Sequence, residues 1–438
     1  MSRTGQFALL GERRFGPFFW TQFSGAANDN VFKSSFMLLV TYSSPALTSL
    51  DVSTAVNMIA AVFILPFLLF SATSGQVSDK IDKARLMRAV KLFEVAIMLA
   101  GAWGFYAHSF PVLLACIFLM GMHSTLFGPA KYAYLPQHLG AEEIVGGNGM
   151  VEMGTFVAIL LGTLAGGVLI GSGEDGPLYA AATCLALALL GLLASAGIPR
   201  TPPADPDLEL DLNPVRVTWR NLRLARAEPT VFVSLLGISW LWFYGVLFLT
   251  QFPPFARDVL GGGPGVANLL LAMFTCGTAV GALGCDRLSR HRIELGLVPL
   301  GVLGMTLFGI DLYFAIPPAP ADRLQTVAQF LSHARHWRVL ADLFLLSICA
   351  GIYSVPLYAL IQTRCPETHR ARIIAANNIL NALFMILASG FAIGVLVLLG
   401  ATIAQLFLAA ALLNAAVGAF LCVRMPEFPQ RFVVWLRR

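Results

Sequence analysis

Polar side chains that can bind ligands or carry charge interrupt the first long apolar stretch of the chain. This stretch begins near Pro17 and is long enough to span a membrane, yet its middle contains Asn28, Asp29, Asn30 and Lys33. An ionised side chain near a bilayer centre costs roughly 2.5–3.5 kcal/mol on insertion scales, so such residues usually face a bundle interior or an aqueous cavity. The pattern predicts a protein that moves a polar ligand through lipid.

Two of these residues, Asp29 and Lys33, stand at i and i+4 and therefore share one face of a helix. They can neutralise one another, which is the usual arrangement of charges inside a membrane. Alternatively they form a charge pair in a cavity that opens for a zwitterionic ligand. The spacing is compatible with both interpretations.

A second pair of charges lies further along, on either side of a short predicted cytoplasmic connection. Lys131 follows a Gly-Pro break in one apolar run, and Glu152 follows a glycine-rich opening of the next. We expect a Lys131–Glu152 pair near the inner mouth, either lining the cavity or lying at the interface with Lys131 extended toward headgroups. His123, on the same run as Lys131, is interpreted as a packing residue rather than a proton carrier.

Composition indicates which elements position these side chains. The 438 residues are 57% hydrophobic and 12% charged, whereas soluble domains carry about 25% charged residues. About twelve apolar runs of the ~20 residues needed to cross a bilayer recur between residues 17 and 424. We predict an all-α membrane protein with twelve transmembrane helices, which fit these runs better than the short alternating strands of a β-barrel.

Basic residues set the expected orientation, because short loops rich in Lys and Arg stay in the cytoplasm. They follow the second and eighth runs, so both termini are predicted to be cytoplasmic. The net charge of +5 is concentrated in such loops and in the tail, which argues for anionic lipid contact and against nucleic acid. The seven cysteines lack a Cys-x-x-Cys pair and are interpreted as packing residues, so no metal or cofactor is predicted.

A polar segment near the middle of the chain divides it into two similar halves. We expect an N-terminal six-helix half at 1–198, a cytoplasmic linker at 199–228, a C-terminal half at 229–424 and an interfacial tail at 425–438. The Gly75…Asp79 stretch after the second run recurs as Gly281…Asp286 roughly 200 residues later, at the same place in the second half. Two parallel six-helix halves are the layout of the major facilitator superfamily, with substrate at the midplane between them.

The first of these stretches continues to Arg85 and resembles the cytoplasmic loop motif of that superfamily. Gly75 permits close helix approach, and Asp79 can cap or pair with a neighbouring helix end. With Asp286 in the second copy, these residues are expected to form a cytoplasmic latch that breaks as the halves rock. Alternatively, the basic residues here only set topology.

The polar residues of the second half are mainly uncharged amides. They include Gln362, Asn377 and Asn381, of which the last two share a helix face. Charge inside the bundle is therefore predicted to be concentrated in the first half. This asymmetry suits an amphiphile with a charged head and a long tail.

Taken together, these segments resemble the lysophospholipid transporter family of the major facilitator superfamily. The resemblance rests on Thr-Gln-Phe-x-Gly-Ala-x-Asn-Asp-Asn near residue 25, Phe-Gly-Pro-Ala-Lys-Tyr near 130, Gly-Asn-Gly-Met-Val-Glu near 150 and Ala-Ala-Asn-Asn-Ile-Leu-Asn ending at Asn381. It covers about residues 13–424. It is closest to the branch fused to an acyltransferase and acyl-carrier-protein synthetase, because Pro426–Leu436 looks like the segment that leads into the acyltransferase there. The chain is thus expected to be either a standalone transporter or a part of such a fusion.

The resemblance implies a flippase of the bacterial cytoplasmic membrane. It would move lysophosphatidylethanolamine-type lipids from the outer to the inner leaflet for reacylation, by alternating access with lateral lipid entry, with an acyltransferase as separate or fused partner. Asp29 would be the gating acid, Lys131 and Glu152 the polar cavity pair, and Asn148 and Gln362 neighbouring polar groups. The standalone transporters carry an Arg on span seven facing the Asp, whereas Leu235–Phe255 contains no basic residue, which leaves Lys33 as a candidate partner.

Two other functions are compatible with the sequence. One is a drug or metabolite exporter of the same fold, coupled to protons through Asp29. The other is a membrane anchor for an acyltransferase that transports nothing itself. An enzyme acting alone is disfavoured, because neither a His-x-x-x-x-Asp acyltransferase signature nor a nucleotide-binding glycine-rich loop is found.

Overall fold

The computed structural model describes residues 5–43, 47–317 and 324–437, and within these ranges all the regular elements are helices. Twelve of them are long. They are α1 (Gly16–Ser43), α2 (Val52–Lys80), α3 (Lys83–Tyr106), α4 (Phe110–His138), α5 (Ile144–Ile170), α6 (Gly176–Ala196), α8 (Pro229–Pro254), α9 (Pro264–Leu288), α10 (Leu297–Ala315), α12 (Ala334–Arg364), α13 (Arg370–Ile393) and α14 (Ile403–Arg424). Three shorter helices are α7 (Pro214–Arg226), α11 (Val327–Ser332) and α15 (Glu427–Leu436).

The predicted all-α membrane fold is confirmed. Ten helices of the described residues are long and apolar enough to cross a membrane. The other two long helices, α1 and α3, are not among these ten and carry polar or charged residues well inside their length. Asn28, Asp29 and Asn30 lie in the middle of α1, and basic residues fill the first turns of α3.

Residue contacts divide the chain into two compact units. The first unit consists of Met1–Gly140, Val157–Glu228 and Gln362–Ile379, and the second of Ala141–Phe156, Pro229–Ile361 and Leu380–Arg438. Each unit thus takes a short segment from the other predicted half. The first turns of α13 belong to the first unit, and the first turns of α5 belong to the second.

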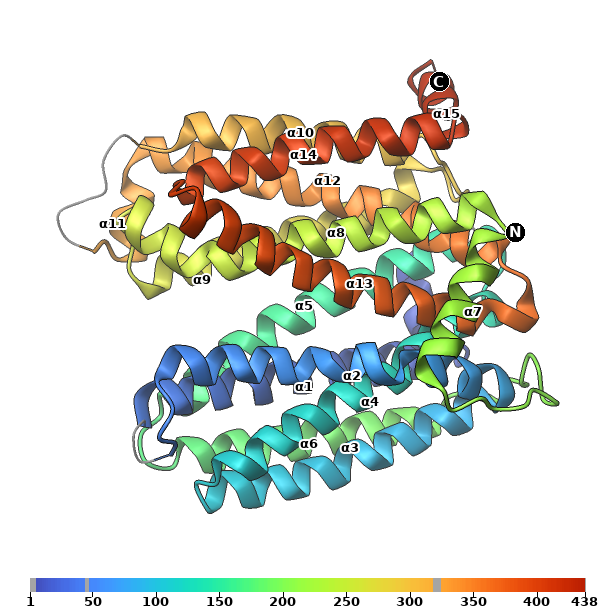
Figure 1. Cartoon of the computed structure of the whole chain (residues 1–438), viewed down its shortest axis with the longest axis horizontal. Helices are drawn as coiled ribbons and strands as arrows, with labels where there is room; N and C mark the ends of the chain where they lie inside the picture. The colour runs from blue at the N-terminus through green and yellow to red at the C-terminus, as the bar shows by residue number, and fades with distance from the viewer. Residues whose placement is uncertain (1–4, 44–46, 318–323, 438) are drawn as a thin grey trace. The chain divides into compact units, whose positions relative to one another are not determined.

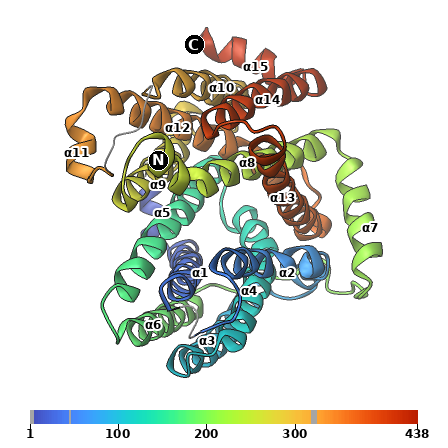
Figure 2. The same cartoon turned by 60° about the vertical axis from the view of Figure 1, so that its left-hand side comes forward.

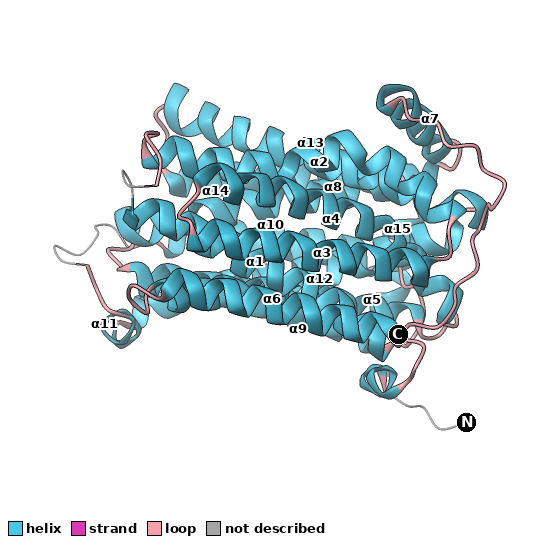
Figure 3. Ribbon diagram, turned by 90° about the horizontal axis from the view of Figure 1, so that it is seen from below, coloured by secondary structure: helices cyan, strands magenta, loops and turns pink. Residues whose placement is uncertain are grey.

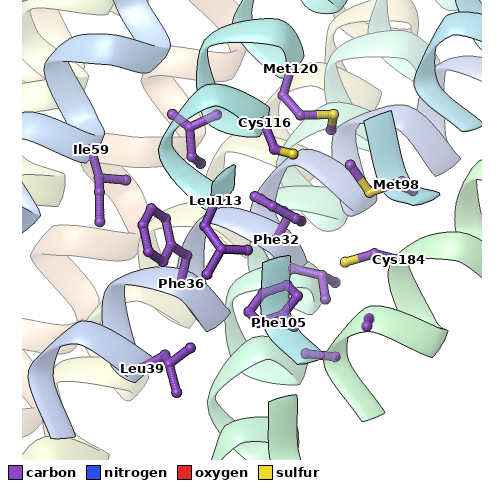
Figure 4. Close-up of a cluster of buried hydrophobic side chains, with 14 of the residues drawn as sticks. Phe32, Phe36, Leu39, Ile59, Met98, Phe105, Leu113, Cys116, Met120 and Cys184 are labelled. Carbon is purple, nitrogen blue, oxygen red and sulfur yellow. The ribbon is translucent and has the colours of Figure 1, made fainter. Parts of the chain in front are cut away.

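The first unit is built around an apolar core shared by five helices, which run lengthwise beside one another (Figure 3). Figure 4 shows its side chains, which are Phe32, Phe36 and Leu39 of α1, Ile59 of α2, Met98 and Phe105 of α3, Leu113, Cys116 and Met120 of α4 and Cys184 of α6. Phe32 packs edge-on against Phe105 at 5.3 Å between ring centroids. A Cβ atom at Gly101 would lie 2.6 Å from the Phe32 ring, so this glycine makes room for it.

Aromatic stacking and small residues hold the second unit together. Phe248 of α8 stacks on Phe407 of α14 with ring centroids 4.3 Å apart. The helices α10 and α14 lie side by side (Figure 1). A Cβ atom at Gly418 would collide with Val302, so this glycine allows the close approach of the two helices.

The linker folds back over the end of α2. Gln76 exchanges two hydrogen bonds with the backbone of Asp211, at 2.9 and 3.0 Å. The Lys80 ammonium donates to the carbonyl of Leu208 at 2.8 Å. The linker then enters α7, whose first turn is capped by the Asn213 side chain. Figure 1 shows α7 crossing the end of α2.

Candidate functional site

A cluster of ionisable side chains lies at the middle of three helices of the first unit. Glu94 of α3 accepts hydrogen bonds from Asn28 of α1 at 2.7 Å and from the Lys91 ammonium at 2.6 Å. The Nε2 atom of His123 on α4 lies 3.2 Å from the same carboxylate. Each of these helices contributes from near its midpoint, so the cluster lies near the middle of the helix bundle.

The cluster is closed to its surroundings. The Glu94 side chain is 0% and that of Lys91 1% exposed. Glycines provide the space for the ammonium, since a Cβ atom would lie 2.5 Å from Lys91 Nζ at Gly25 and 3.2 Å from it at Gly191. Charges this deep require close partners. We therefore assign this cluster a structural role in joining α1, α3 and α4.

Asp29 lies beside this cluster with a different partner. Its Oδ2 atom accepts a hydrogen bond from the Ser124 hydroxyl of α4 at 2.5 Å. Its Oδ1 atom is buried and has no hydrogen-bond partner among the described residues. One carboxylate oxygen is thus held by the Ser124 hydroxyl, whereas the other is buried without a hydrogen bond from the described residues.

Lys33, one turn further along α1, contacts an aromatic ring. Its ammonium lies 4.9 Å from the centroid of the Phe63 ring of α2. The ion pairs of the described residues do not include one between Asp29 and Lys33. Of the two arrangements compatible with the sequence, direct neutralisation is therefore not the one in this structure.

Asn30, the other predicted polar residue of this segment, bonds within its own helix. Its amide donates to the carbonyl of Ala26 at 2.8 Å. A Cβ atom at Gly162 of α5 would lie 2.6 Å from the carbonyl of Ala27 and 2.9 Å from the Asn30 Cβ atom. This glycine lets α5 pack directly on the backbone of α1 beside the site.

The remaining predicted cavity residues are distributed over both units. Lys131 lies in the first unit with its ammonium 5.0 Å from the centroid of the Tyr132 ring, and the buried Glu152 lies in the second. Their pairing remains a prediction. Asn148, also in the second unit, donates to the carbonyl of Ile144 at 2.8 Å. The predicted amides of α12 and α13, Gln362 and Asn377, are buried in the first unit.

The predicted latch residue Asp79 is fully buried at the end of α2, against the first turn of α13. Its carboxylate accepts hydrogen bonds from the backbone N–H groups of Ala371 at 3.2 Å and Arg372 at 3.3 Å. It also accepts from the Arg372 guanidinium at 3.1 Å, and that guanidinium donates to Asp205 of the linker at 2.9 Å. A carboxylate at a helix N-terminus is favoured by the helix dipole.

The other latch residues have separate environments. A Cβ atom at Gly75 would lie 2.6 Å from that of Ala375, so Gly75 allows α2 and α13 to approach closely. Arg85 is exposed, and its backbone N–H donates to the capping Asp82 side chain, while its guanidinium has no hydrogen bond with the described residues. In the second unit, Asp286 lies 2.9 Å from Nδ1 of His291. The structure thus brings Gly75 and Asp79 together at α13 and leaves the Arg85 side chain outside this contact.

Buried polar contacts in the middle of the second unit join neutral groups. The Trp240 indole donates to Asn414 at 2.8 Å, and the Asn414 amide donates to Thr306 at 2.9 Å. The Ser239 hydroxyl donates to Asn381 at 2.8 Å. These contacts connect α8 with α10, α13 and α14.

Four functional candidates were missed by sequence reasoning. Lys91 and Glu94 follow the basic loop before α3 so closely that their charges merge with its topology signal. Their i, i+3 spacing within an apolar run was the available sign of a buried pair. Arg372 and Asp205 join Asp79 only through contacts distant in sequence, for which the local pattern gives no sign.

Comparisons with known proteins identify both the fold and a set of relatives. The family model described as "Major Facilitator Superfamily" matches residues 31–389. The lysophospholipid transporter LplT of Salmonella paratyphi B is 30% identical over 351 residues, which are 77% of this chain and 78% of that protein. LplT of Enterobacter sp. is 29% identical over 339 residues, which are 75% of this chain and 77% of that protein.

Solved structures agree in fold. A bacterial homologue of the iron transporter ferroportin matches with a TM-score of 0.64 at 15% identity, covering 96% of this chain and 100% of that one. The fucose:proton symporter FucP of E. coli matches with a TM-score of 0.68 at 13% identity, and the match covers 94% of this chain and 98% of FucP. At these identities the likeness concerns the fold alone.

Proposed function

We propose that this chain, which belongs to the Major Facilitator Superfamily, transports lysophospholipids. The observation that carries the proposal is the pair Asp29 and Lys33 on α1, opposite charges one turn apart that are not bonded to each other. The similarity to lysophospholipid transporters over about three quarters of the chain supports the same substrate class.

The chemistry of the pair matches the head of a lysophospholipid. Such a head carries a phosphate and often an ammonium, and exposing either to hydrocarbon is costly. Lys33 can meet the phosphate and the unpartnered Oδ1 atom of Asp29 the ammonium. Lys131 and Glu152 are proposed to extend this polar path. No covalent step takes part in the cycle.

We further propose that the lipid moves from the outer to the inner leaflet of the bacterial cytoplasmic membrane. It enters and leaves sideways, so that its acyl chain stays in lipid while its head occupies the polar path. The product would be reacylated by an acyltransferase, either separate or on the same polypeptide. The contact of Asp79 with Arg372 and Asp205 would act as a cytoplasmic latch that opens during the cycle.

The test is uptake of head-group-labelled lysophosphatidylethanolamine into spheroplasts that contain an acyltransferase and lack their own transporter. We expect the wild-type chain to take up the lipid. In Asp29→Asn the uptake should fall at least about tenfold, because losing about 1.4 kcal/mol of head-group binding corresponds to a factor of ten. Asp175→Asn makes the same chemical change at an exposed loop residue and is expected to retain uptake.

Two outcomes separate the proposal from its alternatives. A folded wild-type chain that takes up no lysolipid would overturn the proposal. Substrate efflux driven by a proton gradient would then favour the exporter. Wild-type reacylation that persists in both Asp29→Asn and Lys131→Ala would favour the membrane anchor.

A further inference from the structure

The short helix α7 has two faces of different character. Val217, Asn221 and Ala225 recur at four-residue spacing and are buried against the first unit. On the opposite face, Val215 and Trp219 are 77% and 62% exposed. An amphipathic helix normally turns its apolar stripe inward, so exposed Val and Trp on the outer face indicate a second apolar contact.

Arginines surround this exposed apolar face. Residues 214–226 contain four arginines and no acidic residue. Arg216 is paired with Asp211 at 2.8 Å, and Arg220 donates to Gln76 at 3.0 Å. The remaining two, Arg223 and Arg226, are exposed, with Arg226 5.7 Å from the Trp219 ring. Arg216 and Arg220 therefore fix α7 to its surroundings, and Arg223 and Arg226 are exposed on a helix whose Trp219 ring lies beside Arg226.

The position of α7 limits what this face can meet. Gln76, to which Arg220 bonds, lies in the last turn of α2, which is one of the candidate membrane spans. Only Ala227 and Glu228 separate α7 from the first residue of α8, another candidate span. Figure 2 shows α7 beside α2, on the side away from α3 and α6. The helix therefore lies at the depth where the spans meet the headgroups.

We propose that the outer face of α7 binds the anionic headgroups of bilayer phospholipids in the cytoplasmic leaflet. Trp is enriched at membrane interfaces, and the cytoplasmic leaflet attracts basic segments with about 1 kcal/mol for each Lys or Arg near its surface. Trp219 and Val215 enter the interface, and Arg223 and Arg226 meet the phosphates. This surface is separate from the Asp29–Lys33 pair and does not depend on the transported substrate.

Lipid binding at α7 would also steady the latch. The linker that precedes α7 carries Asp205, which accepts a hydrogen bond from Arg372. The same linker is fixed to α2 by the two bonds between Gln76 and Asp211. A lipid-bound α7 therefore holds the linker over the contact between Asp79 and Arg372.

The test is hydrogen exchange of the amides of residues 217–226 in the full chain. It compares nanodiscs of phosphatidylcholine alone with nanodiscs that also contain phosphatidylglycerol. We expect the anionic lipid to slow exchange roughly fivefold for each arginine that meets a headgroup. The variant R223Q/R226Q should lose this slowing, and R223K/R226K should keep most of it because lysine retains the charge.

A matched control is R287Q/R292Q, which removes two positive charges from exposed positions, one in the last turn of α9 and one just after it. It should retain the lipid-dependent slowing in α7. Equal exchange in the two bilayers for the wild-type chain would overturn the proposal. An equal loss of slowing in R287Q/R292Q would also overturn it, because the effect would then reflect overall charge. Neither result depends on lysolipid uptake.

Discussion

The two units bury polar groups by different chemistry. In the first unit, the middle of the bundle holds the ionisable groups Lys91, Glu94 and His123, with Asp29 beside them. In the second, the corresponding contacts join amides, an indole and hydroxyls, centred on Asn414 and Asn381. Both sets connect neighbouring helices, but the ionic one pays a far larger desolvation cost.

This difference indicates where a charged head would bind. Glu94 is saturated by three neighbours and is available to no ligand. Asp29 and Lys33 form no salt bridge with each other among the described residues, and the Oδ1 atom of Asp29 has no hydrogen-bond partner there. Around Asn414 and Asn381 the second unit offers neutral groups, which suit an acyl chain better than a phosphate. The following substitutions test the contrast between ionic and neutral buried contacts.

The largest effect is expected for Glu94→Ala. The substitution leaves the Lys91 ammonium buried without a counter-ion, which should cost about 3–5 kcal/mol of unfolding free energy. Unfolding by titration with dodecyl sulfate measures this change in free energy. The double variant Lys91→Met/Glu94→Leu removes both charges and should recover most of the loss. A cost near zero for the single variant would mean that the cluster is not ionised.

The second effect concerns the latch. Arg372→Met removes the guanidinium from Asp79 and Asp205 but leaves the two backbone N–H bonds to Asp79. Bonds to charged groups are each worth about 1.5–3 kcal/mol, so the amides of the first turn of α13 should exchange at least about tenfold faster. Arg85→Met is the matched control, because this exposed side chain has no hydrogen bond or ion pair with the described residues, and it should change exchange little.

A smaller effect is expected in the second unit. Asn414→Leu breaks the bonds to Trp240, Val302 and Thr306. Interhelical hydrogen bonds in membranes average about 0.6 kcal/mol each, so the cost should be about 2 kcal/mol in the same dodecyl sulfate titration. Leu412→Ala, on the outer face of α14, serves as the reference. A loss as large as that of Glu94→Ala would erase the contrast between the units.

The smallest effect is that of Ser239→Ala. It removes one hydroxyl bond to Asn381 and should lower the unfolding free energy by about 0.6 kcal/mol. The same titration measures it, with Ser172→Ala at an exposed helix end as the comparison. A change above about 2 kcal/mol would show that the neutral network is more strongly coupled than its single bonds indicate.

The fold was largely predictable from the sequence, because the apolar runs needed to cross a bilayer are a strong signal. The polar segment of α1 was likewise visible, since an Asn-Asp-Asn triplet is costly in lipid. The partners of Asp79 were not predictable. Arg372 is 293 positions away in the chain, and its position at the start of a helix gave no reason to choose it among several arginines.

The charged cluster shows a second limit. The sequence around His123 does not distinguish a histidine that packs against apolar groups from one that lies beside a carboxylate. Only the fold brings Glu94 next to it. For Asp29 and Lys33, helical spacing predicted a shared face correctly. Spacing alone could not show that Ser124 and Phe63, on other helices, would take the places of a direct partner.

The most direct test of the central claim compares two substrates in the Asp29→Asn variant. Lysophosphatidylethanolamine carries the ammonium that Asp29 is proposed to meet, whereas lysophosphatidic acid lacks it. The account predicts that the substitution lowers uptake of the first at least about tenfold more than uptake of the second, relative to wild type. An equal loss for both lipids, in a variant that folds as well as the wild-type chain, would contradict the assignment of Asp29 to the head group.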